Sequence, residues 1–111
     1  MQILFSGHFL SQINKLEKKF KSVKRDILDC LRVFNVESAV HIGKGIYKIR
    51  ISSSDMNKGK SGAFRSYVYV KLAKQILVPL CIYLKSERES ISIGEITYFA
   101  KKAKEEFLDY L

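Results

Sequence analysis

Acidic residues are scarce in this chain of 111 residues, because 11 aspartates and glutamates stand against 20 lysines and arginines. The formal net charge of +9 excludes a surface of balanced ion pairs. Such an imbalance causes self-repulsion and attracts polyanions. We therefore expect nucleic acid as the first class of partner, an acidic protein as the second and an anionic membrane as the third, against the simpler reading that the charge only aids solubility.

Cysteine is also scarce, and its placement excludes a disulfide framework. Cys30 and Cys81 lie in separate apolar runs without a CxxC spacing, so both are expected to be small buried hydrophobic residues. No group of His, Cys, Asp or Glu has the spacing of metal ligands, so we expect no metal and no cofactor.

Long apolar runs are missing as well. No stretch approaches the roughly 18 apolar residues that a membrane span needs, so no contact with a membrane is expected. The apolar start at residues 1–5 is interrupted by Ser6-Gly7-His8, too early for a signal peptide. The expected location is therefore the cytoplasm.

What the chain does contain is enough apolar material, 47% of its residues, for one packed core. A single domain over residues 1–111 is expected. Apolar residues three or four apart predict helices over 8–20, 22–34 and 92–111, and alternation predicts strands over 46–51, 64–71 and 76–85, besides a short first strand over 1–5.

This order, β-α-α-β-β-β-α, indicates an α+β fold. We expect a small antiparallel sheet with an N-terminal helical hairpin and a C-terminal helix, with the helices packed on one face of the sheet. Pro79 interrupts the last strand and is expected to mark a bulge or the true start of that strand.

Alternation along the three strands predicts one polar face rich in cations and tyrosines. Its expected members are Lys48, Arg50, Arg65, Tyr67, Tyr69, Tyr83 and Lys85, to which the loop over residues 52–62 adds Lys58 and Lys60. Between residues 44 and 88 there are ten cations and two acids, a net charge of +8, so ordinary cross-strand ion pairing is unattainable there. Cations interleaved with aromatic rings suit single-stranded RNA, because they hold phosphates and stack bases.

The residues around this face resemble a known family. Four ordered segments, Lys18–Ile27, Gly45–Arg50, Gly59–Arg65 and Ile82–Glu87, are similar to RelE/HigB-type toxins of bacterial type II toxin–antitoxin systems, and the resemblance covers most of the chain. It implies an endoribonuclease that cuts mRNA, usually on the ribosome, and that a cognate antitoxin silences. Lys48, Arg50 and Arg65 match the family's basic triad, Lys85 matches a further cation, and Lys58 and Lys60 belong to a GKSG-type loop.

Cleavage in such a site is expected to proceed without metal, by attack of the RNA 2′-OH on the adjacent phosphorus. Repulsion within a cation cluster favours a neutral amine, and Lys48 is the candidate base, with Lys85 or Lys60 as the acid. Arg50 and Arg65 are expected to hold the phosphate. His8 and His41 are expected to lie away from this face.

The chain departs from the family pattern at several positions. Ala63 replaces a glycine, Ser66-Tyr67 replaces an apolar pair, and Ile91-Ser92 occupies the region of a base-stacking tyrosine, for which Tyr83 is the expected substitute. Two alternatives therefore stay open: a ParE-like toxin that inhibits DNA gyrase by binding it, and an RNA-binding module without catalytic activity.

Overall fold

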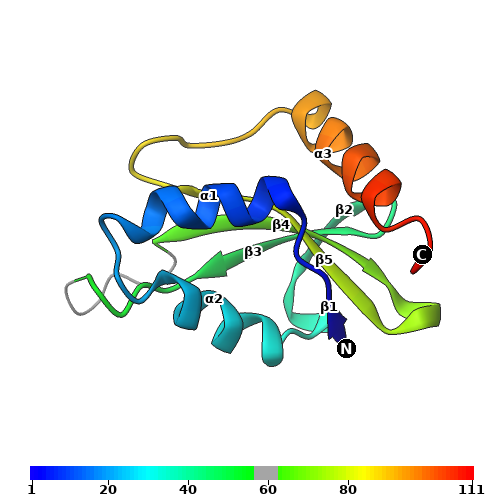
Figure 1. Cartoon of the computed structure of the whole chain (residues 1–111), viewed down its shortest axis with the longest axis horizontal. Helices are drawn as coiled ribbons and strands as arrows, with labels where there is room; N and C mark the ends of the chain where they lie inside the picture. The colour runs from blue at the N-terminus through cyan, green and yellow to red at the C-terminus, as the bar shows by residue number, and fades with distance from the viewer. Residues whose placement is uncertain (57–62) are drawn as a thin grey trace.

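A sheet flanked by three helices forms the body of the molecule, seen in a computed structural model that describes residues 1–56 and 63–111 (Figure 1). Lys58 and Lys60 lie outside the described residues. The helices are α1 (Gly7–Glu17), α2 (Val23–Arg32) and α3 (Ile93–Glu106), with short 3₁₀ turns at Val36–Ser38 and Leu72–Lys74. The strands are β1 (Gln2–Ile3), β2 (Val40–Gly43), β3 (Ile46–Ile51), β4 (Phe64–Lys71) and β5 (Ile76–Leu84).

The five strands form one sheet in the order β1-β5-β4-β3-β2. The α+β class is confirmed, and the long strands pair antiparallel as expected. The sheet is nevertheless mixed, because β1 pairs parallel with β5. Strand β2 was not expected, since only four residues form it, and His41 belongs to it rather than to a loop.

The helices occupy both faces of the sheet, so the expectation of a single covered face is wrong. Helices α1 and α2 bury Phe9, Ile13 and Ile27 against one face, where Ile51, Phe64 and Val68 belong to the same cluster. A second cluster gathers residues of α3 with the opposite face of the sheet: Ile96, Ala100 and Ala103 with Tyr67, Val78, Leu80 and Cys81.

The second cluster exists because of a bulge in β5. Tyr67 pairs with Cys81 and the next residue, Val68, pairs with Pro79, so Leu80 is the extra residue of the strand. Leu80 and Cys81 consequently both contribute to the cluster under α3, where strict alternation would have placed them on opposite faces. The bulge expected at Pro79 is confirmed, and it supplies the apolar surface that α3 covers.

Pro79 is tolerated in an inner strand because β1 is so short. β1 pairs only with Ile76 and Leu77, so the edge of β5 at Pro79 needs no ladder hydrogen bond from a proline nitrogen. Further along the same strand, the backbone N–H of Ile82 donates to Oε1 of Gln12 in α1, at 2.9 Å. A helix side chain thus replaces the missing strand at this edge.

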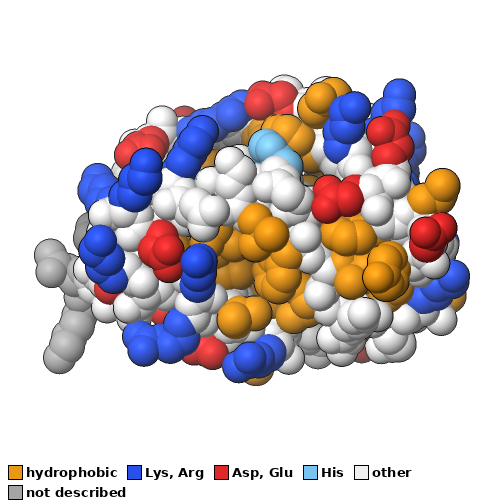
Figure 2. Space-filling model, viewed as in Figure 1, with side chains coloured by type: hydrophobic (Ala, Val, Ile, Leu, Met, Phe, Trp, Pro, Cys, Tyr) orange, Lys and Arg blue, Asp and Glu red, His pale blue; other side chains and the backbone are white. Residues whose placement is uncertain are grey.

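The face of the molecule that carries α1 and α2 has an apolar patch. Figure 2 shows hydrophobic side chains gathered between these helices, where a shallow hollow is lined by Phe5, Leu10, Ile13, Ile27 and Leu28 with Lys24. Two carboxylates accept backbone hydrogen bonds near the start of α2. The Ser22 N–H donates to Asp55, which follows β3, at 2.8 Å, and the Ser54 N–H donates to Asp26 of α2 at 2.9 Å.

Helices α1 and α3 meet at one end of the molecule. The ring of His8 stacks on Phe99 with centroids 4.3 Å apart, and Gly7 N–H donates to the Glu106 carboxylate at 3.3 Å. Burial, with a smaller contribution from Lys15, lowers the pKa of His8 below its ordinary 6.5. The folded state therefore favours neutral His8.

This junction predicts a loss of stability at acid pH. Because the pKa of His8 is lowered by folding, its contribution is present above pH 6.5 and lost as the pH falls through the folded value. His8→Phe keeps the aromatic stack and removes the charge. Between neutral pH and about pH 5, the melting temperature of the wild-type chain should fall further than that of His8→Phe. Parallel melting curves of the two proteins would contradict the inference.

Candidate functional site

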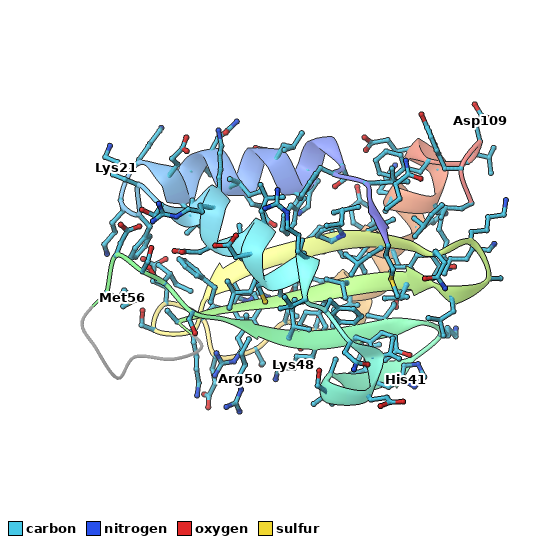
Figure 3. All side chains as sticks on the ribbon, turned by 90° about the horizontal axis from the view of Figure 1, so that it is seen from below. Lys21, His41, Lys48, Arg50, Met56 and Asp109 are labelled. Atoms are coloured by element: carbon cyan, nitrogen blue, oxygen red, sulfur yellow. The ribbon has the colours of Figure 1, made fainter. Side chains whose placement is uncertain are left out.

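Cross-strand register brings the expected basic residues together. Arg50 of β3 pairs with Arg65 of β4, which in turn pairs with Tyr83 of β5, so the three form one row across the sheet. In the next row Lys48 pairs with Tyr67. In Figure 3, Lys48 and Arg50 project from β3 on the side away from α1. We use the name basic row for Arg50, Arg65 and Tyr83 together with the two neighbouring cations, Lys48 and Lys85.

A backbone hydrogen bond places Lys85 beside the other members of the basic row. It follows the last residue of β5, and its N–H donates to the carbonyl of Ala63 at 3.1 Å, which continues the pairing of β5 with the chain entering β4. Lys85 and Arg50 are exposed, and Lys48 is half-buried. Three cations of the basic row are thus open to a ligand from solvent.

Arg65 does not lie on a solvated face as expected, because only 6% of its surface is exposed. β4 is the middle strand of the sheet, so β3 and β5 flank Arg65 on both sides. Its Nη1 donates to the Phe64 carbonyl at 3.4 Å. A buried guanidinium between Arg50 and Tyr83 places a permanent charge beneath the open cations.

The tyrosines expected to stack bases divide in the structure. Tyr67 is only 5% exposed and packs in the cluster under α3, so the expectation of an open ring is wrong. Tyr69 lies one row further, in register with Ile46, and the Lys104 ammonium sits 4.7 Å from its ring centroid. Of the three expected base-stacking residues, only Tyr83 stands in the basic row.

The hydroxyl of Tyr83 is buried next to that of Tyr67 and makes no hydrogen bond of regular geometry to a described residue. Burial, together with the neighbouring Tyr67 hydroxyl, raises the pKa of Tyr83 to about 12, although the charge of Arg65 acts in the opposite direction. The phenol therefore keeps its proton at neutral pH. A protonated hydroxyl beside a guanidinium can donate to an anionic oxygen.

Sequence reasoning missed an ion pair at the border of the site. Arg88, just after β5, pairs with Glu95 in the first turn of α3, and its Nε also donates to the Ser90 carbonyl at 2.8 Å. The hydrogen bond from Arg88 lowers the pKa of the Glu95 carboxyl. The signal that could have located Glu95 is the capping-box spacing from Ser92, whose Oγ accepts from the Glu95 N–H at 3.1 Å.

Carboxylates of the described residues do not pair with the exposed or half-exposed cations of the basic row. In residues 1–56 and 63–111, the four ion pairs involve none of Lys48, Arg50 and Lys85. The same part of the chain contains no group of three or more His, Cys, Asp or Glu that could hold a metal ion. His41 lies against Tyr47, at 4.7 Å between ring centroids, which keeps it with β2 rather than with the basic row. None of the described helices is long and apolar enough to span a bilayer.

The described elements form a small α+β domain with a RelE-like fold. One structural neighbour is a solved structure of the E. coli toxin RelE in the free state, a variant with two arginines replaced by alanine. It superposes with a TM-score of 0.53 at 14% sequence identity, over 92% of this chain and 95% of that one. No family model and no curated protein matches the sequence. The likeness therefore confirms the expected RelE-like fold, and it does not point to HigB-type proteins in particular.

The buried hydroxyl of Tyr83 predicts an unusual response to mutation. Tyr83→Phe removes a buried polar atom that makes no regular hydrogen bond to a described residue, so the free energy of unfolding should stay unchanged or rise by up to about 1 kcal/mol. Urea unfolding measures this, with the exposed Tyr98→Phe as control. In an alkaline absorbance titration, Tyr83→Phe should remove the phenol that ionises near pH 12. A destabilised Tyr83→Phe protein would mean that the hydroxyl is paired.

Proposed function

We propose that this chain, as one domain over residues 1–111, is a toxin endoribonuclease that cleaves mRNA through lysines and arginines. The observation that carries the proposal is the in-register row of Arg50, Arg65 and Tyr83, flanked by Lys48 and Lys85. The local charge of +8 and the RelE-like fold support it. The basic row offers phosphate binding and proton transfer at one place on a rigid sheet.

The reaction needs only groups that RNA and the basic row supply. The 2′-oxygen attacks the adjacent phosphorus while its proton passes to Lys48, the proposed base. The bond from phosphorus to the 5′-oxygen breaks, and Lys85 gives that oxygen a proton. The products are a 2′,3′-cyclic phosphate and a free 5′-OH, and proton transfer of this kind contributes roughly 10²–10⁴-fold in rate. Lys60, outside the described residues, is the alternative acid.

The other members of the row stabilise charge. Arg50 is exposed and can bind a non-bridging phosphate oxygen directly, whereas the Tyr83 hydroxyl is buried beneath the row. Arg65 acts from below, through the field of a buried charge rather than through an open fork. The burial of Tyr67 and the contact of Tyr69 with Lys104 leave Tyr83 as the ring nearest the scissile position.

The proposed partners follow from the same charge. Exposed cations that pair with no carboxylate in the described part of the chain suit mRNA and, as the family resemblance implies, the ribosome. They also suit an acidic segment of a cognate antitoxin that covers the row, and the proposed location is the cytoplasm. The second candidate is an RNA-binding module without catalysis. The burial of Arg65, 6% exposed, favours it, because a buried arginine cannot clamp a phosphate as an open one does.

Substitution at the open cations separates these two candidates. Lys48→Gln and Arg50→Gln should each lower single-turnover RNA cleavage by roughly 10²-fold, the scale for losing one transition-state group. Melting temperatures should stay near that of wild type, because both side chains are wholly or partly open to solvent. Exposed Lys74→Gln carries the same charge change and should cleave normally.

Assays with and without ribosomes decide whether the activity needs them. If wild-type protein binds RNA but leaves it intact under both conditions, the non-catalytic candidate is correct. If it does not bind RNA at all, both candidates are wrong.

Arg65 should behave differently from Arg50. Because Arg65 is buried, Arg65→Ala should lower the free energy of unfolding by about 1–3 kcal/mol as well as lowering cleavage. Arg65→Lys should recover part of the stability and little of the activity, because an ammonium does not reproduce the guanidinium geometry. Urea unfolding and single-turnover cleavage of the three proteins test this. A fully stable Arg65→Ala protein would show that the guanidinium contributes nothing to the fold.

A further inference from the structure

A second group of cations lines a hollow that the proposed cleavage chemistry does not use. The hollow, about 470 Å³ in volume, lies between α3 and the turn that joins β2 to β3. Lys44 of the turn and Lys101 and Lys104 of α3 line it, over apolar surface from Ile46, Ala100 and Leu108. Leu108 is 75% exposed, so part of this apolar surface is open to solvent.

The backbone holds Lys44 at the hollow in a conformation that few residues with a side chain adopt. Lys44 has φ +53°, between Gly43 at +112° and Gly45 at +76°. Left-handed backbone is uncommon outside glycine and favours Asn or Asp among the rest, so lysine is an unexpected residue here. Gly45 is required by packing, because a Cβ there would lie 3.0 Å from the Val70 carbonyl oxygen. The turn is thus fixed against β4, and Lys44 with it.

The positive charge of the hollow is not cancelled within it. Glu105 is its one acid among the lining residues and pairs with Lys102 at 3.8 Å. No ion pair between described residues includes Lys44, Lys101 or Lys104. Lys104 instead contacts the ring of Tyr69. A ligand for this hollow should therefore be anionic and carry flat or apolar surface.

The hollow and the basic row both include residues of strand β3. Ile46 lines the hollow, and Lys48 and Arg50 follow it at alternate positions on the same face of β3. At a rise of about 3.3 Å per residue, Lys44 lies roughly 20 Å from Arg50 along the strand, a distance that several nucleotides of a single strand span. One polyanion can therefore engage both groups of cations at once.

We propose that the hollow binds the same single-stranded RNA as the basic row, several nucleotides away from the phosphate that is cut. Lys44, Lys101 and Lys104 hold phosphates of that part of the strand, and Ile46, Ala100 and Leu108 receive a ribose or the face of a base. This inference rests on the proposed function and adds the length and path of the bound RNA. Because the hollow and the basic row lie along the same strand, one RNA strand is favoured as the ligand here over an acidic peptide.

The test compares short and long RNA. The probes are 2′-O-methyl oligouridines of about four and about twelve nucleotides, which bind without being cleaved. The triple variant Lys44→Gln, Lys101→Gln and Lys104→Gln should bind the long RNA at least tenfold more weakly than wild type does. Its slope of log affinity against log salt should fall by about 2, since each lost phosphate contact accounts for about 0.7. Affinity for the short RNA should stay within about twofold.

The matched control is Lys18→Gln, Lys19→Gln and Lys21→Gln, three exposed lysines on the connection between α1 and α2. Figure 3 shows Lys21 at the opposite end of the molecule from Asp109, which follows α3. The control removes the same total charge and should leave the slope for the long RNA unchanged. Melting curves check that both triple variants fold. If the triple variant of the hollow does not fold, Lys101→Gln alone replaces it, and the expected loss of salt slope is then smaller.

Three results would overturn the inference. In the first, the triple variant of the hollow binds long RNA as tightly as wild type does, while Arg50→Gln weakens the binding of the same RNA. That result would leave the proposed function intact. The second is an equal loss in the control, which makes the effect one of total charge. The third is an unchanged RNA slope combined with lost affinity for an acidic peptide, which makes the hollow a protein-docking site. Failure of wild-type protein to bind either RNA would remove the proposed function together with this inference.

Discussion

The site depends on one constraint, the position of β4 between β3 and β5. Pairing on both sides fixes Arg50, Arg65 and Tyr83 in a single row, with Lys48 one row away. Neighbouring strands lie about 4.8 Å apart, so the register alone holds like charges close together although they repel each other. The core under α1 and α2 holds this register, since Phe64 and Val68 alternate with the polar residues of β4 and are fully buried. Packing on one face thus enforces charge crowding on the other.

That crowding costs stability, and two groups carry most of the cost. Arg65 is buried beside Arg50, and the Tyr83 hydroxyl is buried next to that of Tyr67, with no hydrogen bond of regular geometry to a residue in 1–56 or 63–111. Residues chosen for folding alone would be apolar at both positions, because burying a charged or hydroxyl group is costly even when it finds partners. A phosphate bound at the basic row would lie close to the Arg65 guanidinium, so anion binding should stabilise the folded chain.

The sequence was sufficient for the long elements and for the members of the basic row, because both follow from periodicity. Alternation through Lys48, Arg50 and Arg65 is regular, and the pairing of β3 with β4 has no shift in register. Exposure was not predictable from the same pattern. Whether Arg65 and Tyr67 are open depends on their place in the middle strand and on what α3 covers, which are properties of the strand order and of long-range packing. Strand β2 was not predicted because its four residues are too few to show the alternation of a strand.

The extra residue in β5 accounts for the division of the polar face into two parts. Without the bulge, Leu80 and Cys81 would point to opposite faces, and α3 would lack part of its apolar contact. With it, α3 packs over Tyr67 and Val78, and the open part of the face is confined to the end of the sheet where Arg50, Tyr83 and Lys85 lie. The far edge of α3 then meets the glycine-bounded turn at Lys44, which forms the lysine-lined hollow. One inserted residue in an inner strand thereby sets both the boundary of the basic row and the position of the second group of cations. The two groups nevertheless face the same side of the sheet, because Ile46, Lys48 and Arg50 stand at alternate positions along β3.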